Sequence, residues 1–237
     1  MSRFNKLERF RQNKSFNHFF EAEYHKIVNK DFELKGLWNK SFFKNNNEII
    51  AEFGCGKGEY TYELAKKNPD KNYIGVDIKG ARMWKGAKKS DEEKITNIAF
   101  LRTRIEFTPK CFGKNEIKEI WLTFPDPQLS PKKRIKKRLT SSRFLNYYRN
   151  FLQNNGIINL KTDDDTLYQY TKKVIELNKL ETLIDTEDLY NSKYNNDILS
   201  IRTFYEQMWL DEGKKIKFLS FKQDISKEII EPPVEDE

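Results

Sequence analysis

The sequence has little of what several common protein classes require. Its 237 residues include only two cysteines, Cys55 and Cys111, and two histidines. Two widely separated cysteines provide neither a disulfide framework nor the ligand spacing of a zinc site. No apolar run approaches the roughly 20 residues that a membrane helix needs, and the N-terminus lacks the apolar segment of a secretory signal. We therefore expect no metal, no membrane partner and a cytoplasmic location.

Basic residues are abundant and unevenly placed. The formal net charge is +8, residues 1–47 carry ten Lys and Arg against five Asp and Glu, and residues 132–138 contain six basic side chains in seven. Such charge attracts a polyanion, because neutralising phosphates releases condensed counterions. Net charge alone is equally compatible with a solvated surface, so by itself it does not show that the protein binds a nucleic acid.

The pattern of the sequence changes at Glu48. Residues 1–47 mix aromatic with basic and amide side chains without a clear period, and we interpret them as a basic N-terminal extension. Residues 48–223 alternate short apolar runs with helical patterns, which is typical of one domain with a parallel sheet flanked by helices. Residues 224–237 form an acidic tail that we expect to be disordered.

The expected elements predict the fold class. The strands are expected at 49–53, 73–78, 98–101, 119–124, 156–161, 180–185 and 216–221, and the helices at 59–67, 80–90, 141–153, 166–177 and 204–210. Seven strands with crossover helices predict an α/β fold with a doubly wound, mostly parallel, Rossmann-like sheet. Its ligand should lie beyond the carboxyl ends of the strands, at the switch point of the topology.

A glycine-rich turn follows the first expected strand and leads directly into a helical pattern. It contains Gly54, Gly56 and Gly58, with Glu52 two residues before the first glycine, and the next strand ends in Asp77. Glycines let the backbone approach a ligand closely, helix-start amides carry partial positive charge, and an acid at the position of Asp77 can accept from both hydroxyls of a ribose. The sequence therefore predicts a nucleotide-like cofactor.

Two cofactor classes compete for this turn. A dinucleotide site spaces its glycines G-x-G-x-x-G around a pyrophosphate, whereas here the spacing is G-x-G-x-G with an acid in front. That acid can face the cationic amino group and sulfonium of S-adenosylmethionine, which we favour over a nicotinamide cofactor. The remaining interpretation is that this glycine-rich turn only reverses the direction of the chain and binds no cofactor.

The fourth strand of this domain ends in Phe124-Pro125-Asp126-Pro127-Gln128. The two prolines stiffen the backbone around Asp126 and remove two amide donors, so Asp126 is a candidate substrate ligand, with a turn-forming aspartate as the alternative. The basic residues 132–138 follow directly and would bring phosphate-binding charge beside the chemistry. We favour contact with RNA over a merely solvated surface.

Four motifs in order along the chain resemble the bacterial tRNA (guanine-N7)-methyltransferases. These motifs are E-x-G-x-G-x-G at 52–58, FPDP at 124–127 with its basic run, KTD at 161–163 and TFYE at 203–206. The likeness runs from about Glu48 to Phe221. It implies that residues 48–223 are a methyltransferase domain that uses S-adenosylmethionine to methylate N7 of a variable-loop guanine in tRNA, as a monomer or homodimer.

The resemblance also implies a set of site residues. For the cofactor these are Glu52, Gly54, Gly56, Gly58, Asp77, Arg104 and Glu106; for the substrate guanosine they are Asp126, Lys132, Asp163, Thr203 and Glu206. Two stretches depart from the family pattern. The stretch after the third strand has Arg104 and Glu106 where family members commonly have one acid or amide. Gln128 stands where the family often has Trp, and the approach to Lys132 is longer.

Guanine N7 carries a lone pair and no proton, so methyl transfer needs position and electrostatics rather than a strong base. Asp126 is assigned as the catalytic, orienting residue, because a carboxylate can accept from the guanine N1–H and exocyclic amine, a pair that adenine lacks.

Other functions stay open. A methyltransferase for another RNA or a protein is one. An adenine or glutamine methyltransferase would want an aromatic residue after its Pro-containing motif, which Gln128 does not provide. A non-catalytic RNA-binding subunit and a nicotinamide oxidoreductase are the remaining candidates.

Overall fold

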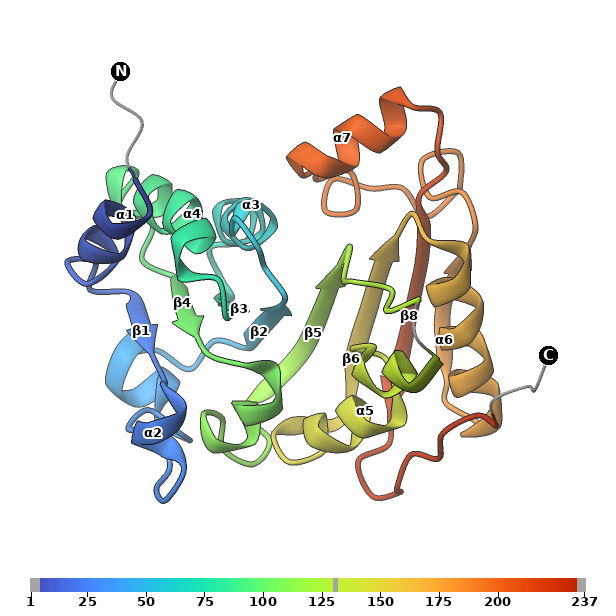
Figure 1. The fold of residues 1–237 in the computed structure, drawn as a ribbon, viewed down its shortest axis with the longest axis horizontal. Helices are drawn as coiled ribbons and strands as arrows, with labels where there is room; N and C mark the ends of the chain where they lie inside the picture. Colours follow the sequence, from blue (N-terminus) through green and yellow to red (C-terminus); the bar gives the residue numbers. More distant parts are fainter. Residues whose placement is uncertain (1–4, 130–131, 234–237) are drawn as a thin grey trace.

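The chain folds around one eight-stranded sheet in the order β1-β4-β3-β2-β5-β6-β8-β7 (Figure 1). The structure is a computed structural model that describes residues 5–129 and 132–233, without the side chains of residues 132, 133 and 205. The strands are β1 Phe19–Glu21, β2 Ile49–Phe53, β3 Asn72–Asp77, β4 Ile98–Arg102, β5 Ile117–Thr123, β6 Leu152–Thr162, β7 Thr182–Thr186 and β8 Lys217–Gln223. β8 runs antiparallel to both β6 and β7, and the other pairs are parallel, which confirms the predicted fold class.

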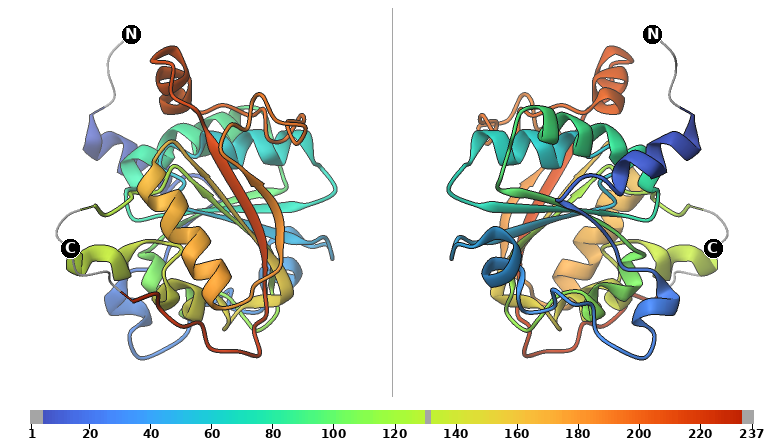
Figure 2. Two further views of the ribbon diagram at one scale, coloured as in Figure 1. Left: turned by 90° about the vertical axis from the view of Figure 1, so that its right-hand side faces the viewer. Right: turned by 90° about the vertical axis from the view of Figure 1, so that its left-hand side faces the viewer.

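Helices cover both faces of the sheet, as Figure 2 shows. The α-helices are α1 Lys6–Asn13, α2 Tyr24–Ile27, α3 Glu59–Lys67, α4 Gly80–Glu92, α5 Ser142–Tyr148, α6 Asp165–Leu177 and α7 Phe204–Asp211. Three six-residue helical turns of other types are η1 Trp38–Phe43, η2 Ile105–Lys110 and η3 Lys132–Lys137. β2 has all five residues buried, because a parallel strand in mid-sheet is covered on both sides.

The core is divided by the sheet into two layers. Ala51 and Phe53 of β2 join the layer that contains Tyr148 of α5 and Val174 of α6. Ile50 joins the other layer, with residues of α3 and α4. The two layers follow from the alternation of side chains along a strand, which places Glu52 on the same face as Ile50 and α3.

The chain reverses its direction of travel across the sheet between β2 and β5. β2, β3 and β4 follow one another toward one edge, and β5 and β6 then begin again on the other side of β2. The carboxyl ends of β2 and β5 therefore diverge into loops on opposite sides, which leaves a crevice between them.

The structure adds a strand within the segment interpreted as an extension. β1 pairs in parallel with β4, and the Asn13 side chain of α1 donates to the Gly80 carbonyl at 2.8 Å. Trp38 is fully buried and its indole N–H donates to the Cys111 carbonyl at 3.0 Å. Sequence periodicity does not reveal β1 or the turn that contains Trp38, because a three-residue strand and a six-residue helical turn are too short to show a period.

Two further boundaries differ from expectation. The helix expected to reach residue 153 ends at Tyr148, and β6 already begins at Leu152, which pairs with Ile117. In the tail that was expected to be disordered, Ile229 is buried and the Glu231 carboxylate accepts from the Ser142 N–H at 3.0 Å and from the Tyr170 hydroxyl. Residues 224–233 thus pack on α5 and α6, whereas 234–237 lie outside the described residues.

The burial of Trp38 predicts that the segment before β2 contributes to stability. Trp38→Ala should lower the free energy of unfolding by about 3–5 kcal/mol, since it removes a buried ring and leaves the Cys111 carbonyl without its donor. Urea denaturation followed by circular dichroism measures this. Leu37→Ala, at an exposed neighbour, is the matched control; equal midpoints for the two variants would contradict the expectation.

Candidate active site

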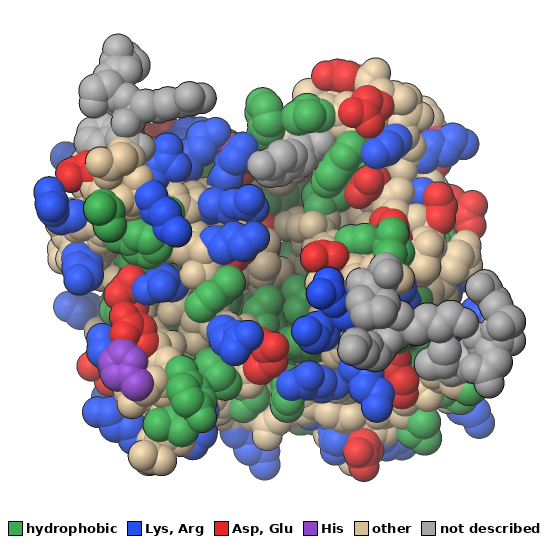
Figure 3. Space-filling view, viewed as in Figure 1, with side chains coloured by type: hydrophobic (Ala, Val, Ile, Leu, Met, Phe, Trp, Pro, Cys, Tyr) green, Lys and Arg blue, Asp and Glu red, His purple; other side chains and the backbone are tan. Residues whose placement is uncertain are grey.

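A cavity of about 560 Å³ opens at the carboxyl ends of β2, β3 and β5. It is lined on one side by the glycine turn and Asp77, and on the other by Phe124, Pro125 and Asp126. Figure 3 shows a hollow in this face, with Lys and Arg side chains on both sides of it. The cavity occupies the crevice that the switch in topology predicts.

The glycine turn packs against its surroundings too closely to accept a side chain at Gly58. This residue has φ +70° and is the N-cap of α3. A Cβ there would lie 2.5 Å from the Phe100 ring. A Cβ on Gly86 of α4 would lie 2.8 Å from the Gly58 carbonyl oxygen, so α4 presses on the same turn. These contacts hold the turn and the first amides of α3 in place at the cavity.

Asp77 is fixed at the mouth of the cavity by backbone donors. Its Oδ2 accepts from the Gly56 N–H at 2.9 Å, and its Oδ1 accepts from the Lys79 N–H at 2.8 Å. The carboxylate therefore joins the end of β3 to the glycine turn while it still lines the cavity. A carboxylate held in this way can accept from a ribose hydroxyl without having to reorganise.

Glu52 lies deeper, with 3% of its surface exposed. Its carboxylate accepts from the Thr61 N–H at 2.8 Å and from the hydroxyls of Thr61 and Thr123. Burial raises the pKa of Glu52 to about 7, against the lowering effect of these hydrogen bonds, and the nearby Asp77 raises it further. Glu52 is thus a buried acid that a cationic ligand could hold in its charged form.

The turn after β5 has an unusual backbone. Phe124 has φ +50°, in the left-handed region, and its N–H donates to the Lys161 carbonyl at 2.8 Å. Asp126 is exposed, and its Oδ1 accepts from the Gln128 N–H at 2.9 Å. The Arg138 guanidinium donates to the Pro127 carbonyl at 2.8 Å, so the end of the basic run supports this turn.

A buried ion pair joins the K-T-D turn to the T-x-x-E turn. Lys161 Nζ lies 2.8 Å from Glu206 Oε1, and both side chains are fully buried. Lys161 also donates to the carbonyls of Leu199 and Ile201 at 2.9 Å, and the Tyr190 hydroxyl donates to Glu206 at 2.5 Å. Burial lowers the pKa of Lys161, whereas Glu206 raises it. The pair anchors the segment that precedes α7.

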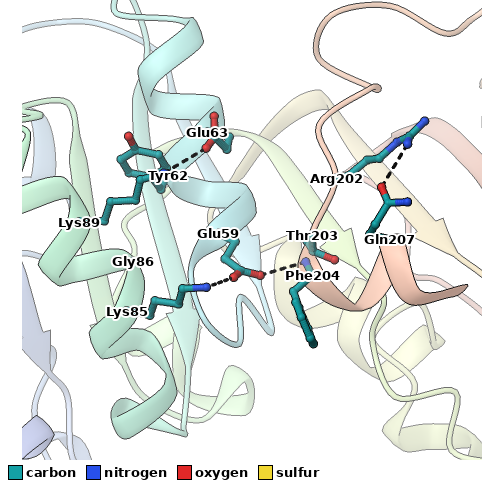
Figure 4. A pocket seen from close by; sticks show the side chains of 10 residues that line it. All are labelled: Glu59, Tyr62, Glu63, Lys85, Gly86, Lys89, Arg202, Thr203, Phe204 and Gln207. Atoms are coloured by element: carbon teal, nitrogen blue, oxygen red, sulfur yellow. Dashed lines mark hydrogen bonds and ion pairs between the residues drawn. The ribbon is translucent and has the colours of Figure 1, made fainter. Parts of the chain in front are cut away.

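A second contact ties α7 to the glycine turn. In the side pocket of Figure 4, the Glu59 carboxylate accepts from the Phe204 N–H at 3.2 Å and from Lys85 Nζ at 2.6 Å. Burial raises the pKa of Glu59, but these two hydrogen bonds and the positive charges of Lys85 and Lys57 together lower it below its ordinary value. At the start of α7, Thr203 and Glu206 form a reciprocal capping box. The helix is therefore held at the cavity from both sides.

The structure brings together some of the predicted site residues and separates others. Glu52, Gly54, Gly56, Asp77, Asp126 and Thr203 line one cavity. Gly58 supports the turn from behind, and Glu206 is buried in its ion pair rather than facing the cavity.

Other predicted residues lie outside this cavity. Arg104 lines a separate depression, and Ile105 lines the main cavity between Arg104 and Glu106. Asp163 lies in another depression near Lys214, and burial raises its pKa. Lys132 begins η3, but its side chain lies outside the described residues.

Sequence reasoning missed several residues of the cavity. Thr123 is the last residue of β5 and could have been inferred from its place beside the predicted Glu52 strand. Trp209 of α7 lines the cavity opposite the glycine turn, and no spacing in the sequence connects it with the motifs. Arg138, counted in the basic run, is buried over the Tyr170 ring and so does not offer its charge to solvent.

Comparison with known proteins agrees with the geometry. Residues 46–219 match a family model described as "Putative methyltransferase". The solved 16S rRNA methyltransferase KamB has the same fold, with a TM-score of 0.57 at 12% identity over 94% of this chain and 95% of that one. Fold and family model together define the class of this protein as a methyltransferase with a Rossmann-like sheet.

Sequence relatives narrow the class. The tRNA (guanine-N(7)-)-methyltransferase of Bacteroides fragilis is 51% identical over 98% of this chain and 90% of its own length. The protein of the same name from Christiangramia forsetii is 48% identical over 92% of this chain and 97% of its own. The chain belongs to the tRNA (guanine-N(7)-)-methyltransferase family.

Among the described residues, no group of three or more His, Cys, Asp or Glu is arranged to hold a metal ion. No helix in the described ranges is both long and apolar enough to cross a bilayer.

The raised pKa of Glu52 predicts a pH-dependent penalty on folding. Between pH 4.5 and about 7 the unfolded chain ionises Glu52 while the folded chain keeps it protonated, so stability falls as pH rises and then levels off. Relative to Glu52→Gln, the free energy of unfolding of the wild type should fall by up to about 3 kcal/mol across this pH range. Urea unfolding at pH 4.5, 6 and 7.5 measures the difference.

Glu92→Gln, which removes an exposed carboxylate of α4, controls for the substitution itself. A difference between wild type and Glu52→Gln that stays constant from pH 4.5 to 7.5 would show that Glu52 ionises normally.

Proposed function

We propose that this protein transfers the methyl group of S-adenosylmethionine to N7 of a guanine in tRNA; the names of its relatives give tRNA guanine-N7 methyl transfer as the activity of those proteins. The observation that carries the proposal is one cavity with carboxylates on both sides of the switch point. Glu52 and Asp77 lie on the β2 and β3 side, and Asp126 lies on the β5 side. A methyl donor and an acceptor base can therefore meet between two acidic walls.

The residues on the β2 and β3 side fit the methyl donor. The Asp77 carboxylate is held at the mouth by two backbone amides and suits a ribose diol. Glu52 supplies negative charge in a site nearly closed to water, where it acts strongly on a cation. We assign Glu52, Gly54, Gly56 and Asp77 to cofactor binding, together with Ile105, which lines the same cavity.

The bound donor supplies a sulfonium methyl carbon that a nucleophile can attack in line. The N7 lone pair forms the new C–N bond while the C–S bond breaks. The electron pair of the broken C–S bond stays on sulfur, which becomes a thioether, and no proton is transferred. Positive charge passes from sulfur to the purine ring. The protein therefore has to align the two reactants and offset the charge that grows on the base.

Asp126 is the group best placed to do both. Its carboxylate stands at the end of β5 in a turn stiffened by two prolines and by the Arg138 contact to Pro127. It can accept from the guanine N1–H and exocyclic amine, which selects guanine over adenine and brings negative charge beside the base. Thr203 of the α7 cap lines the same cavity and offers a further hydroxyl.

The phosphate backbone of tRNA is expected to lie over η3. Arg134, Lys136 and Lys137 of this turn are exposed, and Lys137 also lines the cavity. This arrangement supports binding of the backbone next to the reacting base, with an affinity that falls as salt rises.

The proposed role of Asp126 predicts that the variant Asp126→Asn selectively loses methyl transfer. With labelled S-adenosylmethionine and tRNA that lacks N7-methylguanosine, the wild type should yield N7-methylguanosine on nucleoside analysis. The variant should lose about 100-fold or more in kcat/KM for tRNA while its Kd for the donor, measured by calorimetry, stays within about twofold.

Asp70→Asn is the matched control, because Asp70 is also an exposed aspartate that follows a proline and lies in the turn between α3 and β3. A wild type that labels tRNA at another nucleoside would refute the function. Near-normal transfer by Asp126→Asn would refute only the role of Asp126.

Neutralising η3 should weaken RNA binding without affecting the donor. Arg134→Gln combined with Lys136→Gln should reduce the slope of log Kd for tRNA against log salt by roughly two, one for each lost phosphate contact. Filter binding at 50–200 mM salt measures it. The double variant Lys67→Gln, Lys114→Gln removes two exposed lysines that precede β3 and β5, at the amino ends of the strands, and should keep the wild-type slope. Equal slopes for the two double variants would contradict the placement of the RNA.

A further inference from the structure

We propose that the target guanine stacks on the indole ring of Trp209. This inference rests on the proposed function and adds a residue that binds the base. An enzyme that acts on one base of a folded RNA has to take that base out of its stack, and lost stacking must be replaced in the site. The motif after β5 runs from Phe124 to Gln128 and has no aromatic residue after Asp126. The tertiary structure supplies one from α7.

Trp209 lies in the same cavity as Asp126 and Thr203 and is half-buried, so part of its indole faces the cavity. Of the described residues that line this cavity, Phe124 and Trp209 are the aromatic ones. Their ring centroids are 4.9 Å apart and the rings are inclined at 46°. The two rings form a continuous apolar wall beside the carboxylate assigned to the guanine edge.

The wall is rigid because both of its members are held by backbone or buried contacts. Phe124 keeps its left-handed conformation through the N–H bond to the Lys161 carbonyl. Trp209 belongs to α7, which is anchored by the buried Lys161–Glu206 pair and by the Glu59 contact to the Phe204 N–H. A preorganised aromatic surface loses little conformational entropy when a base binds.

The position of Trp209 assigns it to the base rather than to the methyl donor. The donor side of the cavity is formed by the ends of β2 and β3, whereas Phe124 follows β5 and contacts Trp209 directly. Phe204, an exposed aromatic residue of α7, lines the neighbouring pocket and lies under Lys57 Nζ instead. Among the described side chains of α7, Trp209 is thus the one that lines the cavity together with Asp126.

Stacking on an indole also suits the charge of the reaction. Positive charge grows on the purine as N7 gains its methyl group, and the face of an indole attracts cations more strongly than other aromatic faces do. Trp209 would therefore hold the base before transfer and favour the charged ring during transfer. Selection of guanine would remain with Asp126, because stacking alone accepts any base.

The test compares Trp209→Phe, Trp209→Leu and Trp209→Ala in the full-length protein, with tRNA that lacks N7-methylguanosine as substrate. The Leu and Ala variants should lose roughly 10- to 100-fold in kcat/KM for tRNA. The Phe variant should stay within about fivefold of wild type, because it keeps a π face. The Kd for S-adenosylmethionine and the melting temperature should change little in all three.

Met208→Ala is the matched control, at an exposed neighbour on the same helix, and should behave as wild type. If Trp209→Leu is as active as Trp209→Phe, or if donor binding falls together with tRNA turnover, Trp209 acts as packing and the proposal is overturned. These results are separate from the proposed function, which fails only if the wild type itself forms no N7-methylguanosine.

Discussion

The site depends on one buried carboxylate at the switch point of the sheet. Glu52 is the last but one residue of β2 and lies on the side of α3, where it accepts from Thr61; it also accepts from the Thr123 hydroxyl of β5. One side chain therefore bridges the two halves of the sheet at the point where they diverge. Its burial raises its pKa to about 7, so the same residue that joins the halves also responds to a cationic ligand.

The second organising element is α7, which closes the site from outside the sheet. Its anchors are the buried Lys161–Glu206 pair on one side and Glu59 of α3 on the other. Breaking a buried pair by removing one partner leaves an uncompensated charge, so such a pair holds a helix in one orientation. In this way residues of the K-T-D and T-x-x-E motifs that do not face the cavity still decide where Thr203 and Trp209 lie.

Much of the fold could be predicted because the central elements are long and regular. β2 and α3 have the predicted bounds, and β3, which ends in Asp77, and β5, which precedes Asp126, end within one residue of expectation. Prediction was weakest where elements are short or irregular. β1 has three residues, Trp38 lies in a single helical turn, and the segment around Ile229 is anchored by side-chain contacts that no local pattern encodes.

The sequence by itself determined the chemistry: a glycine turn with acids before and after it and a proline-flanked aspartate, each following a strand, and a basic run shortly after the aspartate. These features are local, since turn geometry and strand ends depend on neighbouring residues. Only the tertiary structure decided which side chains share the cavity. In it Glu206 and Arg138 are buried, Asp163 and Arg104 lie in separate depressions, and Trp209 lines the cavity. The reason is physical, because contacts between distant segments follow from how helices pack on a sheet, and packing has no signature at any one position.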